Sequence, residues 1–134
     1  MLRPDERSDA RERALYLLYE AHSKGIAPAD TLDLQVIEPD ALTRELVTGV
    51  GADIGRLDEL IAAKAKGWTL ARMPVLDLNV MRLAVFELLD RPDVPTAVVL
   101  NEAVELAKRF STDDSGRFVN GVLAAVAAEV RSPA

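Results

Sequence analysis

Two aromatic residues of this chain have an arginine close by in the sequence, a combination that can bind unpaired nucleobases. Phe118 directly follows Arg117, and Arg11 precedes Tyr19 by about two helical turns. A ring that the core does not use can stack on a base, while an adjacent guanidinium binds phosphate. The alternative is that both rings belong to the core of a chain with only 4% aromatic residues. The spacing alone leaves both interpretations open.

Side chains that could support catalysis or metal binding are scarce. The chain has no Cys and a single His, His22, which falls near the end of the first predicted helix, where the helix dipole favours a cation. Glu102 and Glu105 are three residues apart, but metal sites in helical bundles pair each Glu with a His one turn later, and none follows here. Glu105 is spaced to pair with Lys108 or Arg109. We therefore expect no catalytic residue, no metal site and no cofactor, and we place both glutamates on a solvated helix face.

The bulk composition restricts the class of protein. A chain of 134 residues that is 49% hydrophobic and 28% charged suits one globular domain, here with an aliphatic core. The formal net charge of −6 argues against broad attraction to a polyanion, so any nucleic-acid site must be local. The absence of Cys agrees with a reducing compartment. Because no apolar run resembles a signal peptide or a membrane span, we expect a cytoplasmic protein without membrane contact.

Helical periodicity runs through the first third of the chain. Apolar residues recur at i, i+3, i+4 and i+7 before Gly25, which predicts a helix over about residues 8–24 after a charged, flexible segment 1–7. Pro28 can begin a short second helix through residue 34, and Pro39 can begin a third.

The third predicted helix contains three glycines. Its apolar residues are spaced by three or four positions from Leu42 to Ile61, the helical period, despite Gly49, Gly51 and Gly55. Each internal glycine costs about 1 kcal/mol relative to alanine. Close approach of another helix would explain why three are tolerated, and local looseness is the alternative.

The only obvious interior boundary lies around Gly67 and the Met73-Pro74 pair. It divides the chain into helical halves of about 8–66 and 68–131. Three further helices are predicted in the second half, over about 76–90, 96–110 and 115–130. Their connectors are short, as is typical of helical bundles, and no alternating strand pattern is present. The sequence thus predicts a single all-α domain over residues 1–134.

Several segments carry a more specific signal. The most distinctive are Asn101-Glu-Ala-Val-Glu-Leu-Ala-Lys108 and Phe118-Val-Asn-Gly-Val-Leu123. Further matching positions are residues 10–19, Gly49-Val, Ile54, Leu57-Asp58, Trp68, Arg72, Leu76-Asp77, residues 81–88, residues 93–95 and Asp114-Ser. Together they resemble the NusB family of bacterial transcription antitermination factors, over about residues 10–124.

The resemblance implies an all-helical fold of two packed bundles, an amino-terminal one of three helices and a carboxy-terminal one of three or four, without enzymatic activity. It implies binding of the single-stranded boxA element of nascent ribosomal RNA leaders. The partner would be NusE, a small-subunit ribosomal protein, within the antitermination complex of RNA polymerase. By position, the RNA-binding residues would be Arg7, Arg11, Tyr19, Phe110, Asp114, Arg117 and Phe118. NusE would dock on the helix that begins near Asp77, with Leu78 and Met81 at the contact.

Two departures from the family pattern modify these expectations. The amino terminus has four arginines and four acidic residues, so it carries no net charge: Arg3, Arg7, Arg11 and Arg13 stand against Asp5, Glu6, Asp9 and Glu12. We therefore expect more of the RNA contact from Phe110, Asp114, Arg117 and Phe118. Leu78 occupies a position where the family often has a basic residue, which predicts an altered partner contact. The alternatives are a protein-interaction module with weak or lost RNA binding, and a homodimer.

Overall fold

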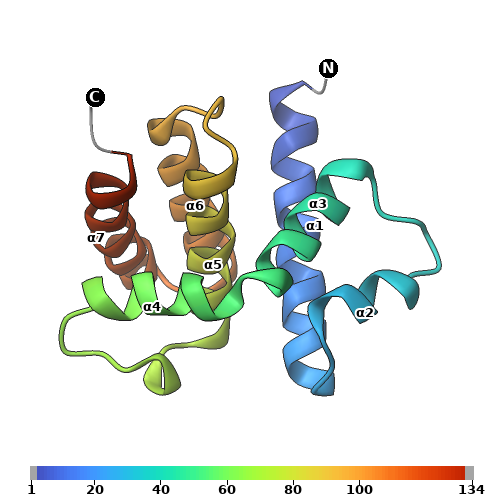
Figure 1. Cartoon of the computed structure of the whole chain (residues 1–134), viewed down its shortest axis with the longest axis horizontal. Coiled ribbons are helices and arrows are strands. Elements are labelled where there is room, and N and C mark those ends of the chain that lie inside the picture. The colour runs from blue at the N-terminus through green and yellow to red at the C-terminus, as the bar shows by residue number, and fades with distance from the viewer. Residues whose placement is uncertain (1–2, 132–134) are drawn as a thin grey trace.

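The computed structural model describes residues 3–131, which form helices and no strand (Figure 1). The elements in chain order are α1 (Pro4–Lys24), α2 (Pro28–Asp33), α3 (Ala41–Ala52), α4 (Ile54–Lys64), the 3-10 helix η1 (Leu70–Arg72), α5 (Val75–Asp90), α6 (Thr96–Phe110) and α7 (Asp113–Val130). The all-α prediction is therefore confirmed for the described part of the chain.

Helix α1 ends where the sequence predicts and begins earlier. Gly25 terminates it with a φ of 65°, a left-handed conformation that glycine adopts without strain. At the other end the helix starts at Pro4, so the described residues of the predicted flexible segment 1–7 are mostly helical. Proline suits the first helical position, and Asp5 and Glu6 suit the first turn because the helix dipole favours negative charge there.

The predicted third helix is two helices that meet at Asp53. Asp53 leaves the helical conformation, with φ −129° and ψ 23°, and α4 continues in a new direction (Figure 1). The apolar spacing hid this break because both helices bury residues at the same period, Leu46 and Val50 in α3 and Leu57 and Ile61 in α4. The spacing of apolar residues predicts which residues are buried, but it does not show whether they belong to one helix or to two helices with different axes.

The close-approach explanation holds for two of the three glycines. A Cβ atom on Gly49 would lie 2.2 Å from Phe86 Cε1 of α5, which no side chain could tolerate without movement. A Cβ on Gly51 would lie 3.1 Å from Pro28 Cβ of α2. Nothing lies within 4 Å of a Cβ on Gly55, so that glycine has no packing reason.

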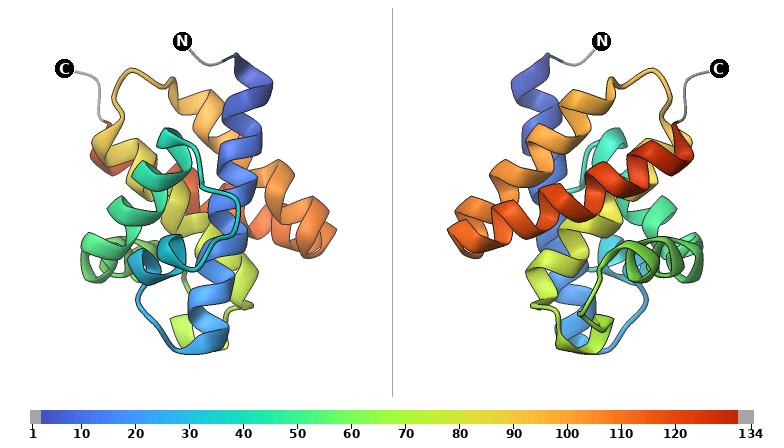
Figure 2. Two further views of the ribbon diagram at one scale, coloured as in Figure 1. Left: turned by 90° about the vertical axis from the view of Figure 1, so that its right-hand side faces the viewer. Right: turned by 90° about the vertical axis from the view of Figure 1, so that its left-hand side faces the viewer.

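The helices form two bundles around α5. Helices α1, α2 and α3 pack together, α4, α6 and α7 pack on α5, and α5 also contacts α1 and α3 (Figure 2). Because α4 belongs with α5 and α7, the change from one bundle to the other falls at Asp53 rather than at Gly67. The fully buried side chains are almost all aliphatic, including Leu15, Leu46, Leu57, Ile61, Val85 and Leu123. No helix among the described residues has the length and apolar character needed to cross a membrane.

Candidate nucleic-acid interface

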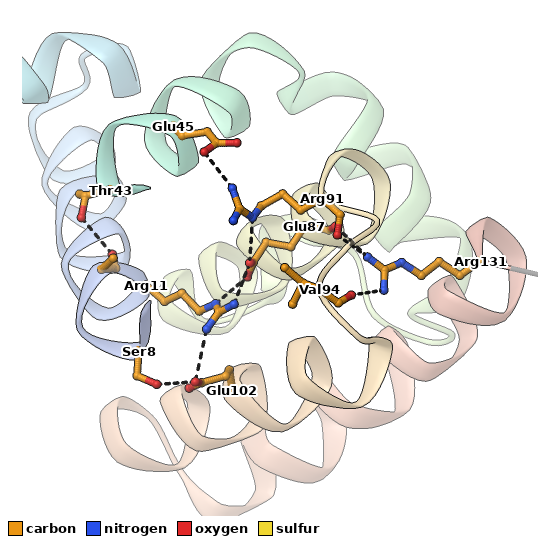
Figure 3. A network of polar contacts seen from close by, with 10 residues as sticks. Ser8, Arg11, Thr43, Glu45, Glu87, Arg91, Val94, Glu102 and Arg131 are labelled. Carbon is orange, nitrogen blue, oxygen red and sulfur yellow. Dashed lines mark hydrogen bonds and ion pairs between the residues drawn. The ribbon is translucent and has the colours of Figure 1, made fainter. Parts of the chain in front are cut away.

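Arg11, predicted to bind RNA, lies inside the protein and joins three helices (Figure 3). Its Nε and Nη2 atoms donate to the two carboxylate oxygens of Glu87 in α5 at 2.8 and 2.9 Å, and Nη1 donates to Glu102 Oε1 in α6 at 3.3 Å. The residue is only 3% exposed. The prediction that Arg11 binds RNA is therefore wrong, because its guanidinium is buried and already bound to two carboxylates.

The protonation of Arg11 follows from the same geometry. Burial alone lowers the pKa of the guanidinium, but the hydrogen bond and charge of Glu87 and the charge of Glu102 outweigh it, so the pKa of Arg11 is raised. Arg11 therefore stays charged. Two parallel hydrogen bonds between Arg11 and Glu87 fix both the distance between the two side chains and their relative orientation. The pair therefore helps to set how α1 lies against α5 and α6.

Glu102 belongs to this network and not to a solvated face. Besides Arg11, it accepts a hydrogen bond from Ser8 Oγ of α1, and its side chain is only partly exposed. The solvated-face prediction is therefore wrong for Glu102 and right for Glu105, which is exposed. Arg109 pairs across to α1, with Nη2 at 2.8 Å from Glu12 Oε1. Two ion pairs thus hold α6 against α1 along one side.

Arg131 makes a second interior junction at the end of α7 (Figure 3). Its guanidinium donates to the backbone carbonyls of Glu87, Leu88, Arg91 and Val94, at 3.1, 3.0, 2.8 and 2.6 Å. The last carbonyls of a helix have no partner within the helix. Arg131 donates to two carbonyls in the last turn of α5, those of Glu87 and Leu88, and so fixes the end of α7 against it.

Arg7 faces away from the candidate aromatic residues. It is partly buried and lines a surface cavity beside α3 together with Leu42 and Glu45. Twelve residues separate Arg7 from Tyr19, a rotation of about 120° around α1. The structure does not bring these two predicted residues together.

A first aromatic pair lies where α1 meets the end of α6. The ring centroids of Tyr16 and Phe110 are 5.4 Å apart in an edge-to-face arrangement, and the guanidinium carbon of Arg109 lies 4.9 Å from the Phe110 centroid. Tyr19 follows one turn later on α1 and is 47% exposed. Tyr16 was not among the residues predicted to bind RNA, although its i, i+3 spacing to Tyr19 could have indicated a shared face.

A second aromatic pair lies beyond the short turn that joins α6 to α7. Thr112 caps α7, because its Oγ1 accepts from the backbone N–H of Ser115 at 3.0 Å. One turn into the helix, Phe118 packs against Trp68 with 5.8 Å between ring centroids. Trp68 is 50% exposed and was not among the residues predicted to bind RNA or a partner. We call the turn at residues 111–112 and the two ring pairs that flank it the α6–α7 corner.

Arg117 and Asp114 are highly exposed polar residues at this corner. They pair with each other at i, i+3 spacing, and their side chains are 80% and 85% exposed. An exposed pair of this kind is worth little, because water screens both charges. Arg117 can therefore exchange Asp114 for another anion at small cost.

The residues predicted to bind a protein partner do not form an exposed surface. Met81 has no exposed area and Asp77 is 3% exposed, while Leu78 is partly buried. The prediction is wrong for Met81, because α5 is the central helix and most of its residues face neighbouring helices. Asp77 lines a cavity beside Trp68 instead.

The remaining chemical candidate is His22, which is exposed in the last turn of α1, where a cation is favoured. Among the described residues, no three His, Cys, Asp or Glu side chains are grouped so that they could hold a metal ion.

Comparison with known proteins assigns the family. The sequence pattern of the NusB family matches residues 8–128. The transcription antitermination protein NusB of Saccharopolyspora erythraea is 51% identical over 127 residues, which cover 90% of this chain and 86% of that protein. T. maritima NusB has a similar fold, with a TM-score of 0.84 at 32% identity over 92% of this chain and 91% of that one. A chain from a crystal structure of the antitermination factors NusB and NusE in complex with double-stranded RNA matches with a TM-score of 0.80 at 26% identity, over 96% and 99% of the two chains. This chain belongs to the NusB family of transcription antitermination proteins, which are not enzymes.

Proposed function

We propose that this protein binds the boxA element of nascent ribosomal RNA leaders together with NusE, and so helps RNA polymerase to resist termination in the cytoplasm. The observation that carries the proposal is the α6–α7 corner, where exposed or half-exposed rings stand beside cationic side chains. Stacking on such rings and neutralisation of a few phosphates are the two interactions that single-stranded RNA recognition combines.

The RNA contacts proposed at the corner come from three helices. Tyr16 and Tyr19 lie on α1, Arg109 and Phe110 at the end of α6, and Asp114, Arg117 and Phe118 in the first turns of α7. Arg11 is excluded because it is buried, and Arg7 because it lies beside α3. The proposed site therefore depends less on the amino terminus than the resemblance alone implies.

A partner is part of the proposal for an electrostatic reason. A formal net charge of −6 opposes the approach of RNA, and only a few cations at the corner can offset it. A basic protein bound beside the corner would supply the missing positive charge. The similarity to a chain from a NusB and NusE complex with RNA supports NusE in this role. Because α5 is mostly buried, we propose that NusE docks on other surface elements.

Fluorescence anisotropy of labelled boxA RNA tests the proposal directly. The protein is titrated with and without NusE, against boxA RNA and against a scrambled RNA of equal composition. We expect the pair to prefer boxA and to bind it more tightly than either protein alone. Phe118→Ala should weaken binding by about 5- to 100-fold, the loss of one stacking interaction. Failure of both the protein and the pair to discriminate boxA from the scrambled RNA contradicts the proposal.

A matched control separates stacking from damage to the fold. Leu34 is also an exposed apolar residue, on the far side of α1, so Leu34→Ala should leave RNA binding unchanged. Phe118 is partly buried against Trp68, so Phe118→Leu preserves apolar volume while removing the aromatic face. Both Phe118 variants should lose affinity if stacking is the cause.

A second candidate function is a protein-interaction module that binds RNA weakly. The segment between α2 and α3 favours it, because three large apolar residues close together in the sequence, Leu34, Val36 and Ile37, are all exposed there. Sedimentation at several concentrations tests self-association through this surface, and Val36→Ser with Ile37→Ser should abolish any dimer that uses it.

A further inference from the structure

The segment that joins α2 to α3 presents its large apolar side chains to solvent. Val36 is 101% exposed, Ile37 75% and Leu34 55%, and the three fall within four consecutive positions of the sequence. A lone exposed apolar residue is ordinary on a protein surface, whereas several close together are typical of a place that contacts another molecule. We call residues 34–38 the α2–α3 segment.

The protein holds the backbone of this segment in place. Arg13 of α1 donates to the backbone carbonyls of Ile37 and Glu38, and Gln35 Nε2 donates to a backbone carbonyl of α2 at 2.9 Å. Pro39, which follows the segment directly, is buried. The polar groups of the segment are thus turned to the protein while its apolar side chains stay outside. A segment that is already ordered loses little conformational entropy when a partner binds it.

The sequence around the segment is acidic. Residues 26–43 contain no Lys, Arg or His, and they contain four exposed carboxylates, at Asp30, Asp33, Glu38 and Asp40. Two arginines of neighbouring helices reach the segment, and both have partners there: Arg13 binds the two carbonyls, and Arg44 Nη2 lies 3.0 Å from Glu38 Oε1. The excess of negative charge suits a cationic partner and repels RNA and anionic lipid surfaces.

The same charge disfavours a second copy of this chain as the occupant. A dimer with two-fold symmetry joins the same surface of both copies. It would therefore bring the four carboxylates of one copy toward those of the other, and like charges that face each other across an interface oppose binding.

The segment lies away from the proposed RNA site. In Figure 1 the loop between α2 and α3 is on one side of α1, and α6 and α7 are on the other side. RNA bound at the α6–α7 corner, with NusE beside it, would leave the segment accessible. A partner at this segment is therefore an additional one.

We propose that the α2–α3 segment docks a cationic protein segment with apolar side chains, which belongs to a partner other than NusE. The apolar side chains of the partner cover Val36 and Ile37, and its Lys or Arg residues pair with the carboxylates at Asp30, Asp33 and Glu38. The inference goes beyond the proposed function and gives the protein a second binding surface.

Three labelled peptides of equal length test the chemistry of the occupant. The first has leucines at helical spacing and lysines elsewhere, the second has serines in place of the leucines, and the third has glutamates in place of the lysines. By fluorescence anisotropy we expect the Lys/Leu peptide to bind at least about tenfold more tightly than either of the others, because only it matches both the apolar side chains and the charge. Equal binding of the Lys/Leu and Lys/Ser peptides would reduce the effect to general attraction of charge and overturns the inference.

Nuclear magnetic resonance on the isotopically labelled protein locates the peptide. The amide signals that shift with the Lys/Leu peptide should lie within residues 30–40 and on the side of α1 that faces them. Shifts centred on the α6–α7 corner overturn the inference.

Val36→Ser with Ile37→Ser removes the apolar contact. The affinity for the Lys/Leu peptide should fall by at least about tenfold. Arg13 binds the backbone carbonyl of residue 37, so the anchor of the segment is kept, and circular dichroism checks the fold. Val36→Leu with Ile37→Leu keeps the apolar character and should keep the affinity. Val98→Ser makes a similar change on a 39% exposed residue of α6 and should also leave it unchanged.

Asp33→Asn removes one charge at the edge of the segment. Because an exposed ion pair contributes little, the affinity for the Lys/Leu peptide should fall by only about two- to fivefold at low salt. Asp93→Asn makes the same change on an exposed residue between α5 and α6 and should have no effect. Equal losses in both variants would show that the net charge of the protein, and not this segment, attracts the peptide, and they overturn the inference.

Two competing occupants are tested directly. Addition of NusE and boxA RNA should leave the peptide affinity unchanged, and displacement of the peptide by NusE assigns the segment to NusE and overturns the inference. Self-association in sedimentation that Val36→Ser with Ile37→Ser abolishes assigns the segment to a second copy and overturns it as well. Failure of the peptide to bind, with discrimination of boxA intact, overturns this inference alone and leaves the proposed function standing.

Discussion

Arg11 and Arg117 are both arginines near an aromatic residue, yet the fold places them in opposite surroundings. Arg11 is 3% exposed and makes two hydrogen bonds to one carboxylate and one to another, whereas the Arg117 side chain is 80% exposed and pairs only with an exposed aspartate. A buried charge must keep its partners, because losing one leaves a desolvated ion. An exposed charge can change partners freely. The interior network therefore holds helices in place, whereas the exposed charges of the α6–α7 corner are free to pair with the RNA that we propose it binds.

Two carboxylates of α5, Glu87 and Asp77, also differ in whether their hydrogen-bonding capacity is met. Both Glu87 and Asp77 lie on α5 and both are almost fully buried. Arg11 donates to both carboxylate oxygens of Glu87, while Asp77 Oδ1 lacks a donor among the described residues. The Glu87 carboxylate, whose two oxygens both accept hydrogen bonds, therefore serves to join α5 to α1. At Asp77 the missing donor leaves a buried polar atom unpaired, which costs stability.

Removing Glu87 should give the largest effect. Glu87→Leu leaves Arg11 charged in a buried site with only the longer contact to Glu102, and we expect a loss of about 3–5 kcal/mol in the free energy of unfolding. Urea denaturation followed by circular dichroism measures it. Glu45→Gln is the matched control, since it breaks the pair with Arg91 at a half-exposed carboxylate and should cost less than about 1 kcal/mol.

The double variant Arg11→Met with Glu87→Leu decides why the loss occurs. If the cost arises from an unpaired buried charge, removing both partners should restore much of the stability, and the double variant should be more stable than Glu87→Leu alone. If the double variant loses as much free energy of unfolding as the two single variants combined, Arg11 and Glu87 act independently. That result would contradict the claim that buried Arg11, unlike exposed Arg117, must keep its partner.

Gly49 tests how far the packing of α3 on α5 depends on apolar contact. Gly49→Ala places a methyl group where Phe86 of α5 lies, so α3 and α5 must separate or the ring must move. We expect a loss of about 1–3 kcal/mol, the usual cost of overpacking. Gly55→Ala adds the same methyl group in open space and should be neutral or stabilising in thermal unfolding. Equal effects at both positions would contradict the close-approach explanation.

Much of this architecture follows from local sequence signals. Gly25 ends α1, and apolar spacing identifies the buried residues of α3 and α4 correctly. The break at Asp53 escapes such signals, because the burial pattern stays in phase while the axis changes. The early start at Pro4 was readable from the proline and the acids that follow it.

The candidate site was harder to predict because burial depends on distant residues. Nothing local distinguishes Arg11 from Arg117. Arg11 is buried because Glu87, 76 positions later, faces it from α5. The same holds for Met81, which lies on a helix that happens to be central. Tyr16 and Trp68 were missed for the opposite reason, since large aromatic residues are usually mostly buried and these two are half exposed.

Tyr19 tests the binding side of the comparison. It is 47% exposed and lies one turn after Tyr16 on α1, so Tyr19→Ala should change stability by less than about 1 kcal/mol. The affinity for boxA RNA in the presence of NusE should fall by about 5- to 100-fold through the loss of stacking. Anisotropy and urea denaturation on the same preparation separate the two quantities. A variant that loses stability and keeps RNA affinity would move Tyr19 from the binding surface to the structural network.

Arg117 should give the smallest effect and the most diagnostic one. With two to four cations at the α6–α7 corner, the slope of log affinity against log salt for a single strand should lie between about −1.4 and −2.8. Arg117→Met should make this slope shallower by about 0.7 and weaken boxA and scrambled RNA alike, because a phosphate contact carries no sequence information. Arg56→Met is the matched control, since Arg56 is also exposed and pairs with an aspartate three residues earlier, away from the corner. A slope much steeper than −3 would require more phosphate contacts than the corner can provide, and it would return the amino-terminal arginines to the RNA site.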